Sequence, residues 1–291
     1  RLGNLDFSEF LPVYIKKLNR KLDIDLSKLK WISDSAYLHA GLDIPRDKSY
    51  VGHNAFLHKA GVHIDASKKG ASYEHEKPED FGNSRIFLMN TLGGRSSIIN
   101  IAENFGFNLD KNDPITIKKI NNLFEELKNL EILGYSLGAL KAEQYLLIKK
   151  HLDNEKKIFE ILEWKIKSEF KENKEISEFN VKCKINEEII EESLCIEGGP
   201  VDAAFKTLKK ILVKNYPQIN ELNLVDFHVS IARPNREESA VRTRIDFKNK
   251  VEFSTVGVNK NILGSAIESL EKGIRYYLMN KDLNKNINND I

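Results

Sequence analysis

The sequence predicts an α+β protein built from several domains, and three observations carry this prediction. Apolar residues recur at helical spacing over residues 7–22 and again over residues 113–153, as they do on one face of an amphipathic helix. From about Ser177 onward, apolar residues alternate with polar ones, which is typical of half-buried strands. A strand, a glycine and a helix then follow one another twice. This order predicts a weak internal repeat of strand layers, each covered by a helix.

The N-terminal half is predicted to be mostly helical around an irregular centre. Helices are expected over residues 7–22 and 26–40, and Gly41 would end the second helix as a left-handed cap. The segment between the two helical regions has no regular period and is rich in histidine: His53, His58, His63 and His75. Residues 113–153 form two further apolar stripes, and Gly134 and Gly138 mark the turn between them. The charged residues 154–175 are expected to continue as helix.

The C-terminal region is predicted to alternate strands with two helices. Strands are expected from Ser177, at 193–197, 224–232, 240–247 and 251–256, with helices through Val213 and over 260–279. Gly198 and Gly199 mark the first junction between strand and helix, and Gly257 marks the second. From these patterns four domains are expected: residues 1–45, 46–95, 96–172 and 173–291.

Composition excludes several classes of function. Among the 291 residues, 45 basic and 43 acidic side chains leave a net charge of only +2, whereas a nucleic-acid binder concentrates basic charge on one face. The sequence contains no apolar run of about 20 residues, the length that crosses a bilayer, and no leader peptide at its start. Cys183 and Cys195 are expected to be free thiols. A cytoplasmic protein is therefore expected.

The run of residues 54–66, Asn-Ala-Phe-Leu-His-Lys-Ala-Gly-Val-His-Ile-Asp-Ala, is the most distinctive part of the chain. It resembles the segment that follows the catalytic barrel in the 2-isopropylmalate, citramalate and homocitrate synthases. Further matches occur in the same order at 73–75, 81–83, 92–97, 199–203 and 255–258. The resemblance extends over nearly the whole chain and implies that the chain is the C-terminal portion of such an enzyme.

In this family a TIM-type barrel binds a divalent metal (Mg, Mn or Zn), which polarises the ketone of a 2-oxo acid. The methyl carbon of acetyl-CoA attacks that ketone, and the thioester is hydrolysed. The opening residues 1–4 resemble the motif of the last barrel strand, which would make Asn4 a metal ligand and residues 7–22 the last barrel helix. Asn4 as a simple turn residue is the alternative. Since most metal ligands of the family precede this motif, the metal is expected to be absent from this chain, and no synthase activity is expected from the chain alone.

The resemblance implies that the segment after Gly61 reaches into the barrel of a partner subunit. His63 is the main catalytic candidate, because imidazole exchanges protons near neutral pH. Asp65 would orient His63 or contact the acyl-CoA, and Tyr73 would offer its hydroxyl to the same site. A histidine that only holds the loop by hydrogen bonds to the backbone is the alternative for His63.

A turn at residues 198–202 provides the candidate effector site: Gly198, Gly199, Pro200 and Asp202. Proline in the first helical position, preceded by glycine, leaves backbone N–H groups exposed at a helix start, and such an end suits a small carboxylate. Gly257 is expected to give a similar geometry in the second unit. A tight turn without a ligand is the alternative.

In the family this last region dimerises and binds an end-product amino acid between subunits, so a homodimer regulated by isoleucine or leucine is expected. Within the family, (R)-citramalate synthase, which uses pyruvate, is favoured by the runs at 73–75 and 198–202. A 2-isopropylmalate synthase is the first alternative. A module that senses an amino acid and performs no chemistry is the second.

Overall fold

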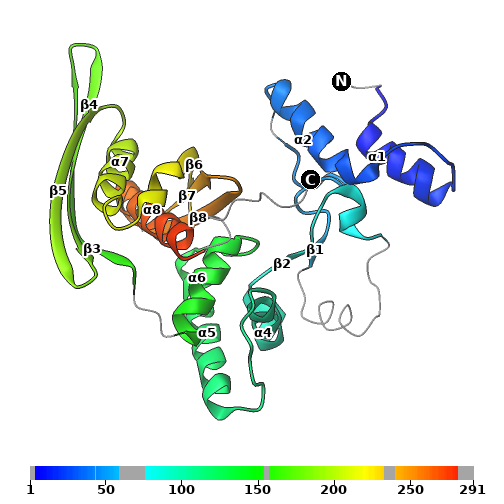
Figure 1. The fold of residues 1–291 in the computed structure, drawn as a ribbon, viewed down its shortest axis with the longest axis horizontal. Coiled ribbons are helices and arrows are strands. Elements are labelled where there is room, and N and C mark those ends of the chain that lie inside the picture. Colours follow the sequence, from blue (N-terminus) through cyan, green and yellow to red (C-terminus); the bar gives the residue numbers. More distant parts are fainter. Residues whose placement is uncertain (1–3, 43, 59–75, 154–156, 233–239, 281–291) are drawn as a thin grey trace. The chain divides into compact units, whose positions relative to one another are not determined.

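The computed structural model describes residues 4–42, 44–58, 76–153, 157–232 and 240–280 (Figure 1). It divides into two compact parts, residues 1–101 and residues 102–291. Helix α4, Gly94–Asn104, crosses the boundary between them.

The N-terminal part begins with a helix that is shorter than the sequence predicts. Helix α1, Phe7–Pro12, starts at the cap residue Asp6 and continues as a π-helix over Val13–Lys17. It ends before Asn19, whose positive φ of 50° places it in the left-handed region, where asparagine is tolerated and helices commonly terminate. The prediction of one helix through residue 22 was therefore wrong in its last turn.

A second helix and a set of short elements complete this part. The 3₁₀ turn Leu26–Lys28 leads into α2, Leu29–His39, and Gly41 follows with a φ of 66°, which confirms the predicted left-handed end. Between α2 and α4 the regular elements that the structure describes are short: strands β1 and β2 and two 3₁₀ turns, at Leu57–His58, Ile86–Phe87, Pro78–Phe81 and Thr91–Gly93. Strands β1 and β2 pair in parallel.

The C-terminal part opens with an antiparallel pair of helices, α5 over Pro114–Leu133 and α6 over Lys141–Leu152. We call this pair the α5–α6 hairpin. Asp113 caps α5 by accepting hydrogen bonds from the backbone of Ile115 and Thr116, and Gly134 ends the helix with a φ of 98°. The two helices and the glycine between them agree with the prediction. An ion pair and a histidine contact at Glu126 join the helices further along.

The first sheet of this part contains a strand where a helix was expected. Strand β3, Phe159–Lys171, pairs with β4, Lys174–Ile185, which pairs in turn with β5, Glu188–Glu197, all antiparallel. The prediction of helix over 154–175 was wrong, because Trp164, Ile166 and Phe170 alternate with charged residues at a period of two, the spacing of a strand. Strand β3 also lies before the boundary predicted at residue 173, so the segment 96–172 is not wholly helical.

Helix α7 and a second sheet follow. Helix α7 spans Pro200–Leu212, and strands β6, β7 and β8 span Asn223–Ile231, Val241–Lys248 and Glu252–Asn259. These strands pair antiparallel in the order β6-β7-β8, and α8, Ile262–Met279, closes the chain's regular structure. We call β3–β5 with α7 the α7 half, and β6–β8 with α8 the α8 half.

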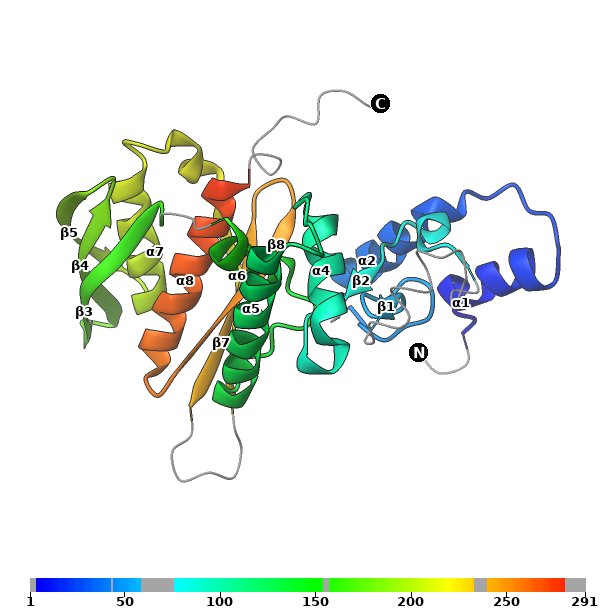
Figure 2. The same ribbon diagram turned by 90° about the horizontal axis from the view of Figure 1, so that it is seen from below.

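The two helices lie between the two sheets, so that α7 covers the β3–β5 sheet and α8 covers the β6–β8 sheet (Figure 2). A single hydrophobic cluster fills the space between these layers and includes residues of both halves. The ring centroids of Phe205 on α7 and Phe247 on β7 are 6.2 Å apart within it. The arrangement is α+β, as predicted, with each sheet followed in the chain by the helix that covers it.

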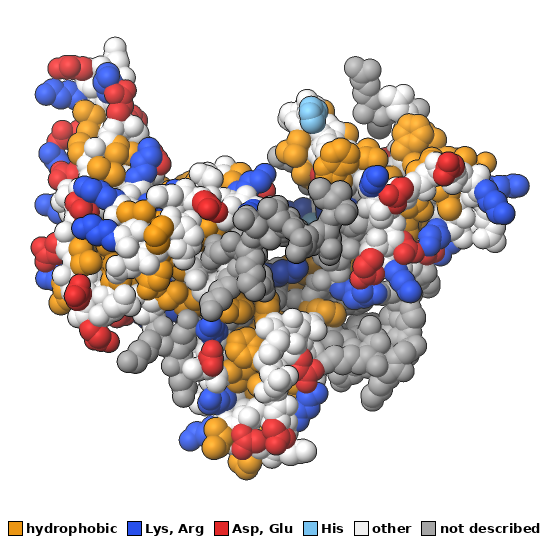
Figure 3. All heavy atoms as spheres, viewed as in Figure 1, with side chains coloured by type: hydrophobic (Ala, Val, Ile, Leu, Met, Phe, Trp, Pro, Cys, Tyr) orange, Lys and Arg blue, Asp and Glu red, His pale blue; other side chains and the backbone are white. Residues whose placement is uncertain are grey.

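Large apolar side chains and charged side chains are both exposed on the surface. On α1 and α2 the exposed side chains include Phe7, Trp31 and Leu38 (Figure 3). The β3–β5 sheet instead carries interspersed acidic and basic side chains, many of them in ion pairs such as Lys182 with Glu191. Among the residues that the structure describes, no helix is both long enough and apolar enough to span a bilayer.

Candidate functional site

Three of the predicted site residues, His63, Asp65 and Tyr73, lie outside the residues that the structure describes. Their catalytic assignment therefore stays a prediction. Asn4, the predicted metal ligand, is exposed in a bend just before α1. Within the described ranges no group of three or more His, Cys, Asp or Glu side chains is placed to hold a metal ion. One exposed amide oxygen does not by itself make a metal site.

The predicted effector turn at residues 198–202 has the local geometry that its sequence suggested. Gly198 has a φ of 149° and donates its N–H to the Glu175 carbonyl oxygen at 2.9 Å, which fastens the turn to β4. Gly199 is the cap residue of α7, Pro200 is its first residue, and no side chain caps this helix end. Asp202 in the first turn pairs with Lys206 at 2.7 Å. The start of α7 therefore keeps its positive end free of side-chain caps.

Gly257 does not form an equivalent turn. It lies inside strand β8, and a Cβ atom at this position would collide with the Ser265 carbonyl oxygen of α8. The glycine therefore permits close approach of strand and helix. The first turn of α8 is already capped, because Asn261 accepts hydrogen bonds from the backbone of Leu263 and Gly264. The expectation of similar geometry at the two junctions was wrong.

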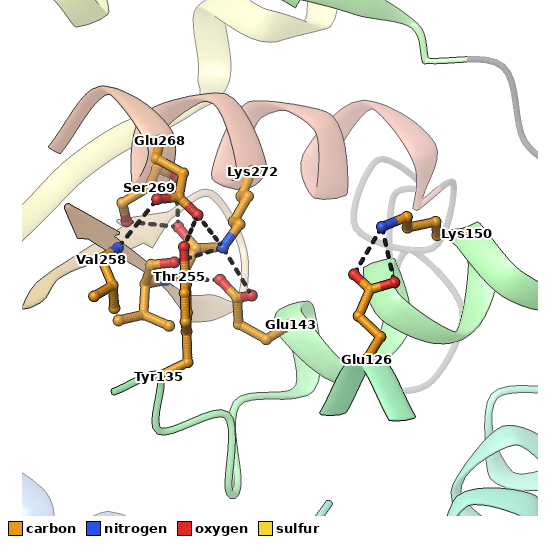
Figure 4. Close-up of polar contacts among 10 residues, drawn as sticks. Glu126, Tyr135, Glu143, Lys150, Thr255, Val258, Glu268, Ser269 and Lys272 are labelled. Atoms are coloured by element: carbon orange, nitrogen blue, oxygen red, sulfur yellow. Dashed lines mark hydrogen bonds and ion pairs between the residues drawn. The ribbon is translucent and has the colours of Figure 1, made fainter. Parts of the chain in front are cut away.

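A cluster of charged side chains that was not predicted lies at the outer edge of the β6–β8 sheet (Figure 4). Helix α6 contributes Glu143, α8 contributes Glu268 and Lys272, and the turn after α5 contributes Tyr135. We call these four residues the charged joint. Lys272 Nζ lies 2.8 Å from Glu268 Oε1 and 3.4 Å from Glu143 Oε2. The Tyr135 hydroxyl donates a hydrogen bond to Glu268.

The charged joint binds the free edge of β8. Glu143 Oε1 accepts the Val256 N–H at 2.7 Å, and Lys272 Nζ donates to the Val256 carbonyl oxygen at 2.8 Å. Glu268 Oε2 accepts the Val258 N–H at 3.1 Å. Since β8 is the outermost strand of its sheet, these groups would otherwise be unpaired and open to another strand. The side chains of two helices thus complete the hydrogen bonding of the edge.

Burial shapes the ionisation of this cluster. The Glu143 side chain is only 5% exposed, and burial raises the pKa of its carboxyl group against the attraction of Lys272. Burial also opposes the charge of Lys272, but the two neighbouring carboxylates outweigh it and raise the pKa of the ammonium group. Burial and the contact with Glu268 raise the pKa of Tyr135 above its ordinary value. Tyr135 therefore remains a hydrogen-bond donor at physiological pH.

One signal in the sequence points to this cluster. Glu143 lies three residues after Leu140 and four before Leu147, which places a carboxylate on the apolar stripe of α6. A charge on an apolar stripe needs a buried partner. The sequence alone could not identify Lys272 as that partner, because more than a hundred residues separate them.

Known proteins match the chain along nearly its whole length. Residues 139–278 match the family model of the LeuA allosteric (dimerisation) domain, and residues 50–131 match that of the homocitrate synthase post-HMGL domain-like family. An (R)-citramalate synthase of Geobacter sulfurreducens is 32% identical over 286 residues, covering 96% of this chain and 53% of the relative. One of Sulfolobus acidocaldarius is 33% identical over 297 residues, covering 99% and 54%.

A 2-isopropylmalate synthase of Bacillus licheniformis is 25% identical over 291 residues, covering 97% of this chain and 52% of the relative. The chain thus spans about half the length of the curated relatives it matches. Identity is higher to the proteins named as citramalate synthases than to those named as 2-isopropylmalate synthases. The allosteric-domain match begins at residue 139 and includes β3, in agreement with the pairing of β3 and β4.

Proposed function

We propose that this chain forms part of an (R)-citramalate synthase. The premise is that the chain belongs to the citramalate and 2-isopropylmalate synthase family and matches its C-terminal portion. The reaction would join pyruvate to acetyl-CoA with water and release citramalate and CoA. The observation that carries the proposal is the identity of 32% and 33% to two citramalate synthases over at least 96% of the chain. The 25% identity to a 2-isopropylmalate synthase makes that enzyme the second candidate.

Within this proposal the C-terminal region of the chain provides regulation and assembly. The α7 and α8 halves would form a homodimer and bind an end-product amino acid, and the match to the LeuA allosteric (dimerisation) domain supports both roles. The α7 and α8 halves would descend from one duplicated unit. Helix α1 would be the last helix of a catalytic barrel, and Asn4 would contribute one metal ligand there.

The uncapped start of α7 is the proposed contact for the effector. A carboxylate bound there would accept backbone N–H groups at the positive end of the helix. The Asp202 carboxylate does not cap the start of α7, because it pairs with Lys206. Capping of these backbone N–H groups would therefore fall to the carboxylate of the ligand. Isoleucine is the expected effector, since citramalate feeds synthesis of that amino acid in the family.

Calorimetric titration of the whole 291-residue chain with isoleucine, and then with leucine, tests the proposal. A truncation at residue 173 would remove β3 and is unsuitable. Binding of isoleucine alone supports citramalate synthesis, and binding of leucine alone transfers the assignment to 2-isopropylmalate synthase. If neither amino acid binds, the effector role is refuted. Sedimentation of the same sample tests the dimer, which a monomer at micromolar concentration would contradict.

The catalytic proposal concerns His63, with Asp65 and Tyr73 as its helpers. In a protein that joins this chain to a catalytic barrel, His63→Ala should lower kcat by about 100-fold or more if the imidazole transfers protons. Thermal unfolding of the variant should be nearly unchanged. A normal kcat would return His63 to a role in holding the loop.

A further inference from the structure

The α5–α6 hairpin and the α8 half touch through charged groups that have little contact with solvent. The Glu143, Lys272 and Glu268 side chains are 5%, 21% and 30% exposed. Two carboxylates surround one ammonium group, so the cluster is satisfied only when Tyr135 and the backbone of β8 supply the remaining hydrogen bonds. A buried polar network of this kind is favourable when complete and unfavourable when any partner is withdrawn. The hairpin therefore has one well-defined position against β8.

A second contact reinforces that position. Arg242 on β7 donates from Nε to the Gly134 carbonyl oxygen at 2.8 Å, at the point where α5 ends. Lys272 Nζ also lies 4.5 Å from the centroid of the Tyr135 ring, as in a cation–π contact. These contacts attach the α5 end of the turn to the α8 half, and Glu143 in the first turn of α6 attaches the other end.

The charged joint contributes more to the position of the hairpin against β8 than to the free energy of unfolding. The attraction within a buried ion pair offsets only part of its desolvation cost, and apolar residues of similar size often stabilise a protein equally. An apolar contact, however, would allow the hairpin to slide along β8. The hydrogen bond that Glu143 accepts from the Val256 N–H, and the contacts of Glu143 and Tyr135 with α8, are directed and fix its register. A contact with a fixed register can pass a displacement of α8 on to the hairpin.

A continuous chain of packed groups leads from the start of α7 to the charged joint. Helix α7 contacts α8 directly, and Phe205 of α7 packs near Phe247 under α8. Helix α8 presents Glu268 and Lys272 to the hairpin one turn apart. A shift of α7 on binding a ligand would therefore act on α8 and, through these two side chains, on α6.

We propose that the charged joint of Tyr135, Glu143, Glu268 and Lys272 transmits effector binding from the C-terminal sheets to the α5–α6 hairpin. The inference rests on the proposed function, because it needs an effector that binds the α7 half. Glu143 is the positioning residue at the centre of the joint: it is the one member on α6 and contacts both β8 and Lys272. The hairpin precedes β3 in the chain and follows α4, so it connects the regulatory region to the segment with the predicted catalytic residues.

Hydrogen–deuterium exchange of the whole chain, with and without saturating isoleucine, tests this inference. In the wild type, isoleucine should slow exchange at the start of α7 and, by about 5-fold or more, over residues 135–152, which matches a modest coupling between sites. In Glu143→Gln the amide can still accept the Val256 N–H but no longer pairs with Lys272. Protection at α7 should persist in this variant, and the change over 135–152 should disappear.

Two further variants make the test specific. Glu126→Gln removes a comparable carboxylate from the same hairpin, where Glu126 pairs with Lys150 at 2.7 Å away from β8 (Figure 4), and it should transmit normally. Tyr135→Phe removes only one hydroxyl and should weaken transmission, which covers the case in which Glu143→Gln fails to fold.

Each outcome is decisive. A wild-type chain that binds isoleucine without any change over 135–152 refutes the joint and leaves the proposed function intact. If isoleucine changes exchange over 135–152 as much in both Glu143→Gln and Tyr135→Phe as in the wild type, the inference is also refuted. A wild type that binds neither isoleucine nor leucine refutes the effector role itself, and the transmission inference is refuted with it.

Discussion

The α7 half and the α8 half contain the same order of elements, three antiparallel strands followed by a helix, but they differ in how each helix meets its surroundings. Helix α7 begins at Gly199 without a side-chain cap, whereas Asn261 caps α8. The edge of the α8 half is closed by the charged joint. In the α7 half, β3 and β5 are the two edge strands of the sheet.

The difference shows that elements at equivalent positions in the two halves can have different local roles. In the α8 half, Gly257 brings strand and helix together and the charged joint attaches them to the α5–α6 hairpin. In the α7 half, the glycines precede an exposed helix end. One half is therefore suited to hold neighbouring elements and the other to receive a ligand.

The largest expected effect follows from truncating the buried carboxylate of the charged joint. Glu143→Ala leaves the Val256 N–H without its acceptor and leaves Lys272 with one carboxylate, Glu268, in place of two. The loss should lie near the lower end of the range of about 3–5 kcal/mol that breaking a buried pair costs. The matched change Glu126→Ala removes a carboxylate that is 28% exposed and pairs with Lys150, which is 60% exposed, and with His151. Because water reaches this ion pair, the change should cost less than about 1.5 kcal/mol. Urea denaturation of the chain measures both.

Equal losses in the two variants would contradict the contrast. They would mean that Glu143 is accessible to water in solution and that its surroundings do not distinguish it from Glu126. A change in the slope of the urea transition, rather than in its midpoint, would instead indicate that the variant no longer unfolds in one step.

A comparison of two glycines should show the next largest effect. Gly257→Ala forces a Cβ atom against the backbone of α8, and overpacking of this kind costs about 1–3 kcal/mol. Gly199→Ala meets no atom within 4 Å and should change stability by less than about 1 kcal/mol. A destabilising Gly199→Ala would show that the α7 turn is as tightly packed as β8.

The sequence predicted much of this architecture, because period and turn residues are local properties. The helices α5, α6, α7 and α8 and most strands were expected close to their observed positions. Strand β3 was missed because its charges suggested a solvated helix, although Trp164, Ile166 and Phe170 already alternate. The role of Gly257 was also missed, since only the packed α8 shows why the strand needs a glycine.

The candidate sites were predicted less completely than the fold. The turn at Gly198 and Gly199 could be recognised because Pro200 marks a helix start within the local sequence. The charged joint could not be assembled from the sequence, since its members come from α6, α8 and the turn after α5. Such a site depends on long-range packing, which a single sequence specifies but does not display.

The two helix starts predict opposite effects on stability. Asn261→Ala should destabilise the chain by about 1 kcal/mol, because it removes the cap of α8. Gly199→Asp should be neutral or stabilising by only about a few tenths of a kcal/mol, since the extended backbone at Gly199 suits a capping carboxylate. The same carboxylate would occupy the proposed effector contact, so isoleucine binding should be lost. Thermal unfolding and calorimetry together measure both effects, and retained isoleucine binding in Gly199→Asp would place the effector elsewhere.

The smallest effect concerns the two thiols of the α7 half. Burial raises the pKa of Cys183, which is 1% exposed on β4, from 9.0 to about 12. Between these values the unfolded chain loses the thiol proton and the folded chain keeps it, so stability falls as pH rises. The loss should reach about 0.8 kcal/mol near pH 9.5. Cys183→Ala should remove this part of the alkaline slope, although the variant starts from lower stability.

Cys195, which is exposed on β5, provides the matched control. Cys195→Ala removes a thiol from the same half without opening a cavity in the core, so its urea stability is the reference for the loss of a thiol outside the core. An equal slope in wild type and Cys183→Ala would mean that water reaches the core of the α7 half. The halves would then differ in the packing of their cores as well as in their contacts with the α5–α6 hairpin.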